Sequence, residues 1–321
     1  MLPVVDLRSP ALDAAAAVDE ACRGLGFFYV VGHGVDPALA DRLDAAARDF
    51  FARPDGEKAA IAMVHGGPAW RGWFPLGGEL TSGVPDGKEG LYFGAELGPD
   101  HPQVAAGTPL HGPNLFPAEP TALRGAVLAW LDAMTALGHR LAGLVAVALG
   151  IDPGWFARTV TADPTILFRI FRYPPSPDPG SGWGVAEHTD YGLLTILRQD
   201  DAGGLEVRTA TGWAGAPPIT GSFVVNIGDM LDRMTGGRYR STPHRVRNTS
   251  GRDRVSLAFF FDPSWDAEVV PLPMDGAPAP DDAATRWDGA SLAAWHGTYG
   301  EYLLTKVARV FPDLADRTQR R

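Results

Sequence analysis

The sequence has very little cysteine and no obvious targeting segment. Its 321 residues include one cysteine, Cys22, which excludes an internal disulfide and a zinc site built on cysteines. The first residues, MLPVVDLRSPALDAAAA, lack the basic segment and long apolar run of a signal peptide. No apolar stretch reaches the ~18 residues that a membrane span needs. We therefore expect a cytoplasmic protein that does not enter a membrane.

An excess of positive charge is also missing. Lys and Arg number 28 against 38 Asp and Glu, so the net charge is −10. Nucleic acids and anionic membrane surfaces attract basic proteins, and we expect neither as a partner. A small-molecule substrate is the partner that we expect instead. No motif indicates an oligomeric state.

Several common catalytic motifs do not occur. The sequence contains no G-x-G-x-x-G, G-x-x-x-x-G-K-[ST], H-E-x-x-H or G-x-S-x-G pattern. Dinucleotide binding, P-loop nucleotide binding, zinc-protease chemistry and serine-hydrolase chemistry thereby become poor hypotheses.

The pattern that is present changes along the chain. Residues 1–120 contain two amphipathic helices, at 13–26 and 36–53, and a glycine- and proline-rich irregular stretch at 64–118. A long apolar helix covers 120–151. Short β-type runs separated by turns fill 165–262, which is typical of an antiparallel sandwich or barrel, and a final helix covers 289–311. Without a repeat or linker, residues 1–321 are predicted to form one α+β domain with a mainly β core.

Two histidines and an aspartate lie within these β-type runs. His188 and Asp190 are at positions i and i+2 of GVAEHTDYGLLTIL, and such positions share one face of a strand. His244 follows in the strand-like segment STPHRV. Two imidazoles and one carboxylate form the facial triad that suits non-haem Fe(II) and leaves coordination positions open. The alternative for any one histidine is an ordinary hydrogen-bonded residue.

A third pair of residues favours the metal site. Arg254 and Ser256 are at i and i+2 of the β-type run RVSLAFFF. A guanidinium that faces inward is unstable unless it meets an anion, and its planar shape suits a carboxylate. This pair, following H-x-D and the later histidine, predicts a site that binds a carboxylate next to a metal.

The order H-T-D, H-R-V and R-V-S on a β core resembles the isopenicillin N synthase-like family of Fe(II)/2-oxoglutarate-dependent oxygenases. The resemblance extends over nearly the whole chain, through GFFYVVGHGV near the N-terminus, RGW at 71–73, DGKEGLYFG at 86–94, RYP at 172–174 and NIGDMLDRMTGGRYRSTPHRV at 226–246.

The resemblance implies a double-stranded β-helix (jelly roll) at 165–262, wrapped by helices. It implies that His188, Asp190 and His244 are the Fe(II) ligands and act in catalysis. Arg254 and Ser256 would bind the distal carboxylate of 2-oxoglutarate, with a hydrogen bond from Tyr173. The implied reaction consumes O2, oxidises a small-molecule substrate and converts 2-oxoglutarate to succinate and CO2.

The substrate is not indicated by any motif, nor is the choice among hydroxylation, desaturation and ring closure. In the family the substrate is read by the N-terminal region and by residues beside the ligands. The candidates, each of which could equally be a packing residue, are Arg71, Trp73, Tyr92, Arg172, Trp183, Tyr191 and Phe260. Arg71 and Arg172, if they face inward, would favour a substrate that carries a carboxylate.

Two other functions remain open. The family contains Fe(II) oxidases that do not use 2-oxoglutarate, and some of them retain the R-x-S pair. A non-catalytic jelly-roll binding protein is the third hypothesis. It would have no need for three intact ligands.

Overall fold

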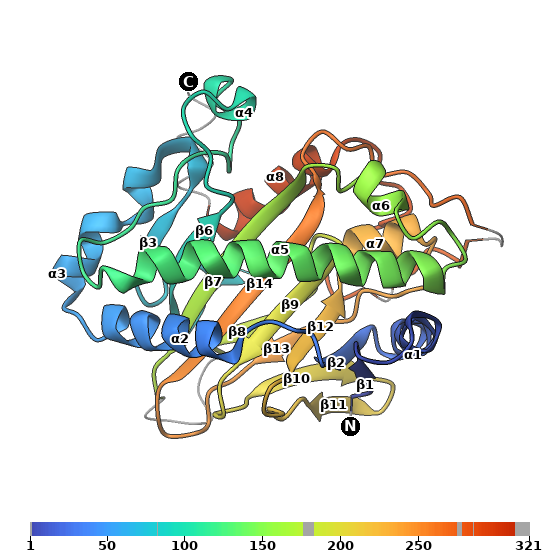
Figure 1. Ribbon diagram of the computed structural model, residues 1–321, viewed down its shortest axis with the longest axis horizontal. Coiled ribbons are helices and arrows are strands. Elements are labelled where there is room, and N and C mark those ends of the chain that lie inside the picture. Colours follow the sequence, from blue (N-terminus) through green and yellow to red (C-terminus); the bar gives the residue numbers. More distant parts are fainter. Residues whose placement is uncertain (1, 82, 176–182, 275–277, 285, 312–321) are drawn as a thin grey trace.

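Two β-sheets form the centre of the molecule in the computed structural model, which describes residues 2–81, 83–175, 183–274, 278–284 and 286–311 (Figure 1). The larger sheet contains, in spatial order, β1 (Val4–Asp6), β2 (Phe27–Val31), β12 (Phe223–Ile227), β9 (Leu194–Gln199), β14 (Arg254–Ser264), β7 (Pro164–Tyr173), β6 (Glu89–Gly94) and β3 (Gly72–Phe74). The smaller sheet contains β11 (Gly212–Gly215), β10 (Leu205–Thr209), β13 (His244–Val246) and β8 (Val185–His188). A separate hairpin pairs β4 (Leu80–Thr81) with β5 (Val84–Pro85).

Strands β7 to β14 cross repeatedly from one sheet to the other. β7, β9, β12 and β14 belong to the larger sheet, whereas β8, β10, β11 and β13 belong to the smaller one. Pairing within this segment is antiparallel throughout. This is the double-stranded β-helix that the resemblance implied, and the prediction of the fold class is confirmed.

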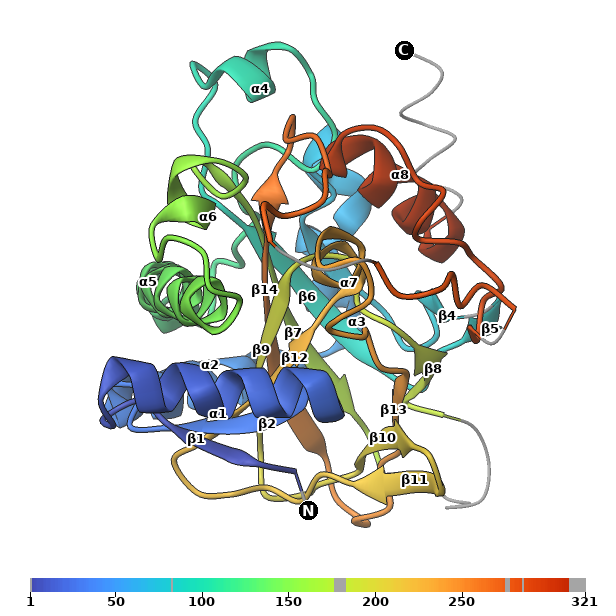
Figure 2. The ribbon, with the colours of Figure 1, turned by 90° about the vertical axis from the view of Figure 1, so that its right-hand side faces the viewer.

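Helices cover the outer face of the larger sheet. Figure 2 shows α1 (Ala11–Gly24), α2 (Pro37–Phe51) and α5 (Ala122–Ala148) on the side of that sheet opposite to β8, β10 and β13. Asp36 caps α2, because its carboxylate accepts a hydrogen bond from the Ala38 amide at 2.9 Å. The other helices are α3 (Asp55–Lys58), α4 (Pro102–Ala105), α6 (Trp155–Arg158), α7 (Asp229–Met234), α8 (Tyr299–Val310) and the 3₁₀ turns η1 (Ala59–Ile61) and η2 (Met63–Ala69).

Helix α5 differs from the expectation that no apolar stretch is long enough to span a membrane. Of the helices in the described ranges, it alone is long and apolar enough to cross a membrane by length and composition. It packs on α1, α2, β9 and β14, with Trp130 and Met134 fully buried. These contacts are those of a core helix, because its apolar face is covered by protein.

The contact between α5 and β14 depends on a glycine. A Cβ atom at Gly138 would lie 2.4 Å from the ring of Phe261, whereas one at Gly125 on the same helix would meet nothing within 4 Å. We expect Gly138→Ala to lower the free energy of unfolding by about 1–3 kcal/mol through overpacking. Gly125→Ala should raise it by up to about 1 kcal/mol, because alanine favours a helix. Urea unfolding measures both; equal effects would contradict the close approach.

Three details differ from the sequence-based expectation. The C-terminal helix begins at Tyr299 rather than at 289, because Thr298 and Glu301 form a capping box at its first turn. The stretch 64–118, expected to be irregular, contains β3 and β6, and both join the larger sheet. β8 ends at His188, so Asp190 follows the strand instead of lying on it.

Candidate active site

A cavity of about 500 Å³ lies between the two sheets. Alternate residues of two neighbouring strands of the larger sheet line it, since successive side chains of a strand point to opposite faces. From β7 they are Leu167, Arg169, Phe171 and Tyr173, and from β14 they are Arg254, Ser256, Ala258, Phe260 and Asp262. The N-terminal region and α8 supply further lining residues, among them Glu79, Lys88 and Lys306.

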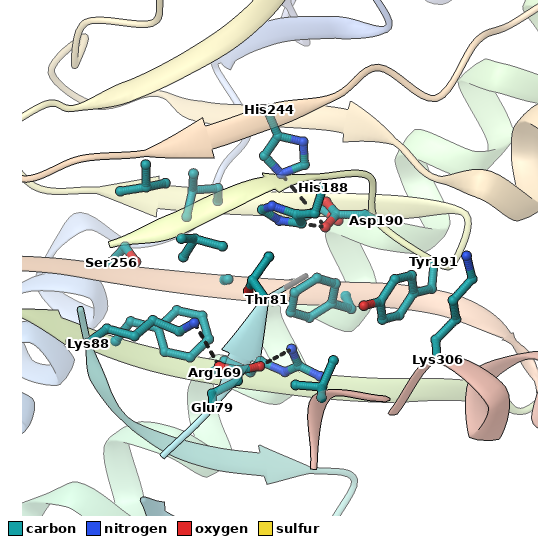
Figure 3. Close-up of a pocket in the computed structure, with 18 of the residues that line it drawn as sticks. Glu79, Thr81, Lys88, Arg169, His188, Asp190, Tyr191, His244, Ser256 and Lys306 are labelled. Atoms are coloured by element: carbon teal, nitrogen blue, oxygen red, sulfur yellow. Dashed lines mark hydrogen bonds and ion pairs between the residues drawn. The ribbon is translucent and has the colours of Figure 1, made fainter. Parts of the chain in front are cut away.

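His188, Asp190 and His244 meet on the wall formed by the smaller sheet (Figure 3). The two histidines are direct cross-strand partners of β8 and β13, and their ring centroids are 4.2 Å apart. The Nε2 atom of each histidine lies 3.8 Å from Oδ1 of Asp190. One nitrogen or oxygen from each residue thus lies within 4.8 Å of the others, a spacing that can hold a metal ion.

The hydrogen bonds of both histidines leave the same nitrogen free. Nδ1 of His188 lies 2.8 Å from the Ala186 carbonyl, and Nδ1 of His244 lies 3.3 Å from that of Thr242. A carbonyl only accepts, so each Nδ1 carries the proton and each Nε2 keeps its lone pair. Burial lowers the pKa of His188, and burial with the neighbouring His188 ring lowers the pKa of His244 to about 4. Both imidazoles are therefore neutral at pH 7, as a metal ligand must be.

Hydrogen bonds also occupy one oxygen of the Asp190 carboxylate and leave the other facing the metal position. Its Oδ2 accepts hydrogen bonds from the Thr195 hydroxyl at 2.5 Å and from the Asn226 amide at 2.7 Å, so Oδ1 remains to face the histidines. Burial alone would raise the pKa of Asp190, but His244, His188 and these two hydrogen bonds outweigh it and lower that pKa. The side chain is ionised at neutral pH.

These supporting hydrogen bonds should affect metal affinity. We expect Thr195→Val to lower the affinity for Fe(II) by roughly 10–100-fold, the usual effect of losing a hydrogen bond to a ligand. Thr209→Val is the matched control, because the Thr209 hydroxyl forms hydrogen bonds within the turn at 209–212, away from Asp190. Anaerobic calorimetry with Fe(II) measures both. Equal affinities for the two variants would contradict the support of Asp190 by Thr195.

A buried guanidinium lies at one end of the cavity. Arg254 is 1% exposed, and its Nε donates to the Gly203 carbonyl at 2.5 Å. Its two terminal nitrogens have no hydrogen-bond partner in the described part of the chain. The guanidinium carbon lies 4.7 Å from the ring centre of Tyr173, and Ser256 lines the cavity beside it. Two unpartnered donors in a buried fork fit a bidentate carboxylate, which is the fit that 2-oxoglutarate requires.

Only two of the seven residues considered as substrate contacts line this cavity. Tyr191 and Phe260 do, and Tyr191 points into it in Figure 3. Trp183 does not, because it packs against the guanidinium groups of Arg245 and Arg247 at 4.1 and 3.9 Å. Trp183 precedes the segment that carries His188 and Asp190, but these contacts hold its ring outside the cavity.

The other four candidates lie outside the cavity in contacts of their own. Arg71 is buried, and it donates to the carbonyls of Phe93 and Leu110. The remaining three all reach glutamates: Arg172 pairs with Glu89 at 2.6 Å, the Trp73 indole donates to Glu89, and the Tyr92 hydroxyl donates to Glu79. Neither Arg71 nor Arg172 faces inward, so neither can read a carboxylate in this cavity.

Sequence reasoning missed three charged residues on the far wall. Glu79, Lys88 and Arg169 lie together across the cavity from the histidines (Figure 3). Lys88 pairs with Glu79 at 2.8 Å, and Arg169 approaches Glu79 at 3.7 Å. Arg169 could have been found, because it is four residues before Tyr173 and must share its face of β7. Glu79 and Lys88 carry no such signal.

Comparison with known proteins places this site in a family. A sequence model of the 2OG-Fe(II) oxygenase superfamily matches residues 164–263, and one described as non-haem dioxygenase in morphine synthesis N-terminal matches residues 2–119. A probable iron/ascorbate oxidoreductase of Dictyostelium discoideum is 46% identical, over 98% of this chain and 95% of that protein. The 2-oxoglutarate-dependent dioxygenase citB of Monascus ruber is 39% identical, over 84% of this chain and 87% of that protein.

Solved structures agree with the sequence matches. A full-length Neurospora crassa protein, solved in complex with alpha-KG, superposes with a TM-score of 0.77 at 25% identity, over 96% of both chains. The chain is therefore a non-haem iron oxygenase that uses Fe(II), 2-oxoglutarate and O2, and it belongs to the isopenicillin N synthase-like family of 2-oxoglutarate-dependent oxygenases.

Proposed function

We propose that His188, Asp190 and His244 bind the Fe(II), and that Arg254, Ser256 and Tyr173 hold the distal carboxylate of 2-oxoglutarate. The observation that carries this proposal is that one cavity contains both a set of metal-ligand atoms and a guanidinium suited to bind a carboxylate. Ligand atoms of the buried Asp190 and His244 and of the half-buried His188 converge within 4.8 Å, and the buried Arg254 guanidinium has two nitrogens without a hydrogen-bond partner among the described residues.

Bound Fe(II) and 2-oxoglutarate supply the oxidising power that acts on a small-molecule substrate, with succinate and CO2 as co-products. The protein's own residues bind and orient. The Ala186 and Thr242 carbonyls fix the two imidazoles, while Thr195 and Asn226 turn one carboxylate oxygen toward the metal position. Asp190 and His244 are buried, which limits the access of bulk water to the metal position.

The cavity supports a single oxygenase domain acting on a small molecule. Its walls come from the N-terminal region, the β core and the C-terminal helix together, so none of these parts forms the site alone. A volume of about 500 Å³ suits a molecule of metabolite size. The net charge of −10 supports a substrate other than nucleic acid.

The test is spectroscopic and anaerobic. Fe(II) is added to metal-free protein and 2-oxoglutarate follows; the expected result is a visible charge-transfer band from 2-oxoglutarate chelated to iron. Iron binding without a band would instead support an oxidase that does not use 2-oxoglutarate. Failure to bind iron would overturn the proposed ligand set.

A further inference from the structure

The second arginine of the cavity, Arg169, lies at the opposite end from Arg254. On the ladder between β7 and β14, Tyr173 is paired with Arg254 and Arg169 with Ala258. Four residues along a strand separate the two positions by roughly 13 Å. The metal ligands lie on the facing wall, across the cavity from Arg169 (Figure 3). With this separation along the strand, the two guanidinium groups belong to different binding regions of one cavity.

The guanidinium of Arg169 is fixed in place but poorly satisfied. It stacks between two rings, with its central carbon 4.3 Å from the centre of Tyr92 and 4.9 Å from that of Phe260. Its side chain is 15% exposed, and its Nε is buried with no hydrogen-bond partner within the described ranges. A stacked, planar and preoriented guanidinium of this kind is suited to bidentate binding.

The carboxylate of Glu79 lies next to Arg169 but accepts no hydrogen bond from its guanidinium in the described part of the chain. NH1 of Arg169 is 3.7 Å from Glu79, which is an ion pair but too long for a hydrogen bond. Glu79 is already bound by Lys88 at 2.8 Å and by the Tyr92 hydroxyl. Lys88 in turn is shared between Glu79 and Asp86, so it has little capacity for a further anion. Among these three residues, Arg169 therefore has hydrogen-bond donors that can bind a further anion.

Basic residues continue from this wall toward α8. Lys306 and Arg309 also line the cavity, and Arg309 is exposed. Lys306 is paired with Asp288 at 3.2 Å, and its ammonium group lies 5.6 Å from the ring centre of Tyr191. The exposed guanidinium of Arg309 favours a negatively charged molecule at this end of the cavity.

We propose that Arg169 is the specificity-determining residue for a substrate that carries a carboxylate. The acid group binds the Arg169 guanidinium in place of its long contact with Glu79. The apolar part of the substrate lies against Phe260 and reaches toward the metal ligands. This inference rests on the proposed function. Because 2-oxoglutarate occupies Arg254 in that proposal, the carboxylate of the substrate binds at a different guanidinium, that of Arg169.

The experiment compares acids with their neutral amides on the anaerobic complex of the enzyme with Fe(II) and saturating 2-oxoglutarate. The probes are octanoate, 3-phenylpropanoate and 4-phenylbutanoate, each paired with its primary amide. Calorimetry gives the dissociation constants, and the charge-transfer band shows whether 2-oxoglutarate stays bound. We expect at least one acid to bind about ten times or more tighter than its amide.

Variants assign that preference to one residue. Arg169→Gln should weaken binding of the acid about tenfold or more and remove most of its advantage over the amide. Arg172→Gln is the matched control, since Arg172 lies on the same strand but outside the cavity. If Arg169→Gln does not fold, Arg169→Lys replaces it, and loss of the planar fork should still weaken the acid several-fold.

The outcomes separate the two proposals. If the wild type forms no band, the proposed function fails. If the band forms but no acid binds, or amides bind as tightly as acids, the carboxylate substrate is wrong. An acid preference that Arg169→Gln leaves unchanged, or that Arg172→Gln removes equally, overturns the role of Arg169.

Discussion

We expect Asp190→Ala to abolish stoichiometric Fe(II) binding and, with it, turnover of 2-oxoglutarate. The variant removes the one anionic ligand and leaves two neutral imidazoles to hold a divalent cation. Loss of a residue that only supports a ligand typically lowers metal affinity by about 10–100-fold, so loss of the ligand itself should exceed that range. Iron content after anaerobic loading and desalting measures the effect, with calorimetry giving the affinity.

A surface aspartate provides the control for this variant. Asp201 has 81% of its side chain exposed and pairs with Arg252, so Asp201→Ala should retain a full complement of iron. The thermal midpoint of each metal-free variant checks that it folds. Stoichiometric iron in a folded Asp190→Ala protein would show that the metal binds elsewhere.

The second large effect concerns Arg254. Arg254→Met keeps much of the apolar stem of the side chain but removes both unpartnered nitrogens. Truncating one side of a buried charge pair typically costs about 2–5 kcal/mol, so the dissociation constant of 2-oxoglutarate should rise by about 100-fold or more. Fe(II) binding should persist, because Arg254 is not among the three residues that converge on the metal position.

Arg252→Met is the companion variant for that experiment. Arg252 is two residues earlier in the chain, half-exposed and paired with Asp201. Titration of the charge-transfer band with 2-oxoglutarate compares the two proteins. An Arg254→Met enzyme with unchanged 2-oxoglutarate affinity would refute the proposed carboxylate site.

The core of the site could be predicted because its signals are local. Arg254 and Ser256 share a face of β14 by alternation alone, and the jelly roll places His188 directly opposite His244. The same alternation separates Arg169 from Arg172, which point to opposite faces of β7. Because Arg169 is an even number of residues from Tyr173, it shares the face of Tyr173, whereas Arg172 does not. This rule would have selected Arg169 as a cavity residue and excluded Arg172.

The rest of the cavity depends on long-range placement. Glu79 and Lys88 come from the stretch expected to be irregular. Lys88 directly precedes β6, which pairs with β7, and Glu79 directly precedes the hairpin of β4 and β5. Arg71 was considered a substrate contact, but its buried guanidinium donates to the backbone carbonyls of Phe93 and Leu110. The residue type alone does not reveal such a structural role. The capping box at Thr298 was a readable signal that would have placed the start of α8 correctly.

The two faces of β14 have separate duties. Ala258, Phe260 and Asp262 face the cavity, whereas Phe259 and Phe261 are buried on the other face, with Phe261 against α5. Mutations of Ala258 or Phe260 can alter which molecule is oxidised while the contact between α5 and the sheet is preserved. A duplicated gene for such a chain can therefore diverge in substrate through single substitutions at these two positions, which change neither the proposed iron ligands nor the contact between α5 and the sheet.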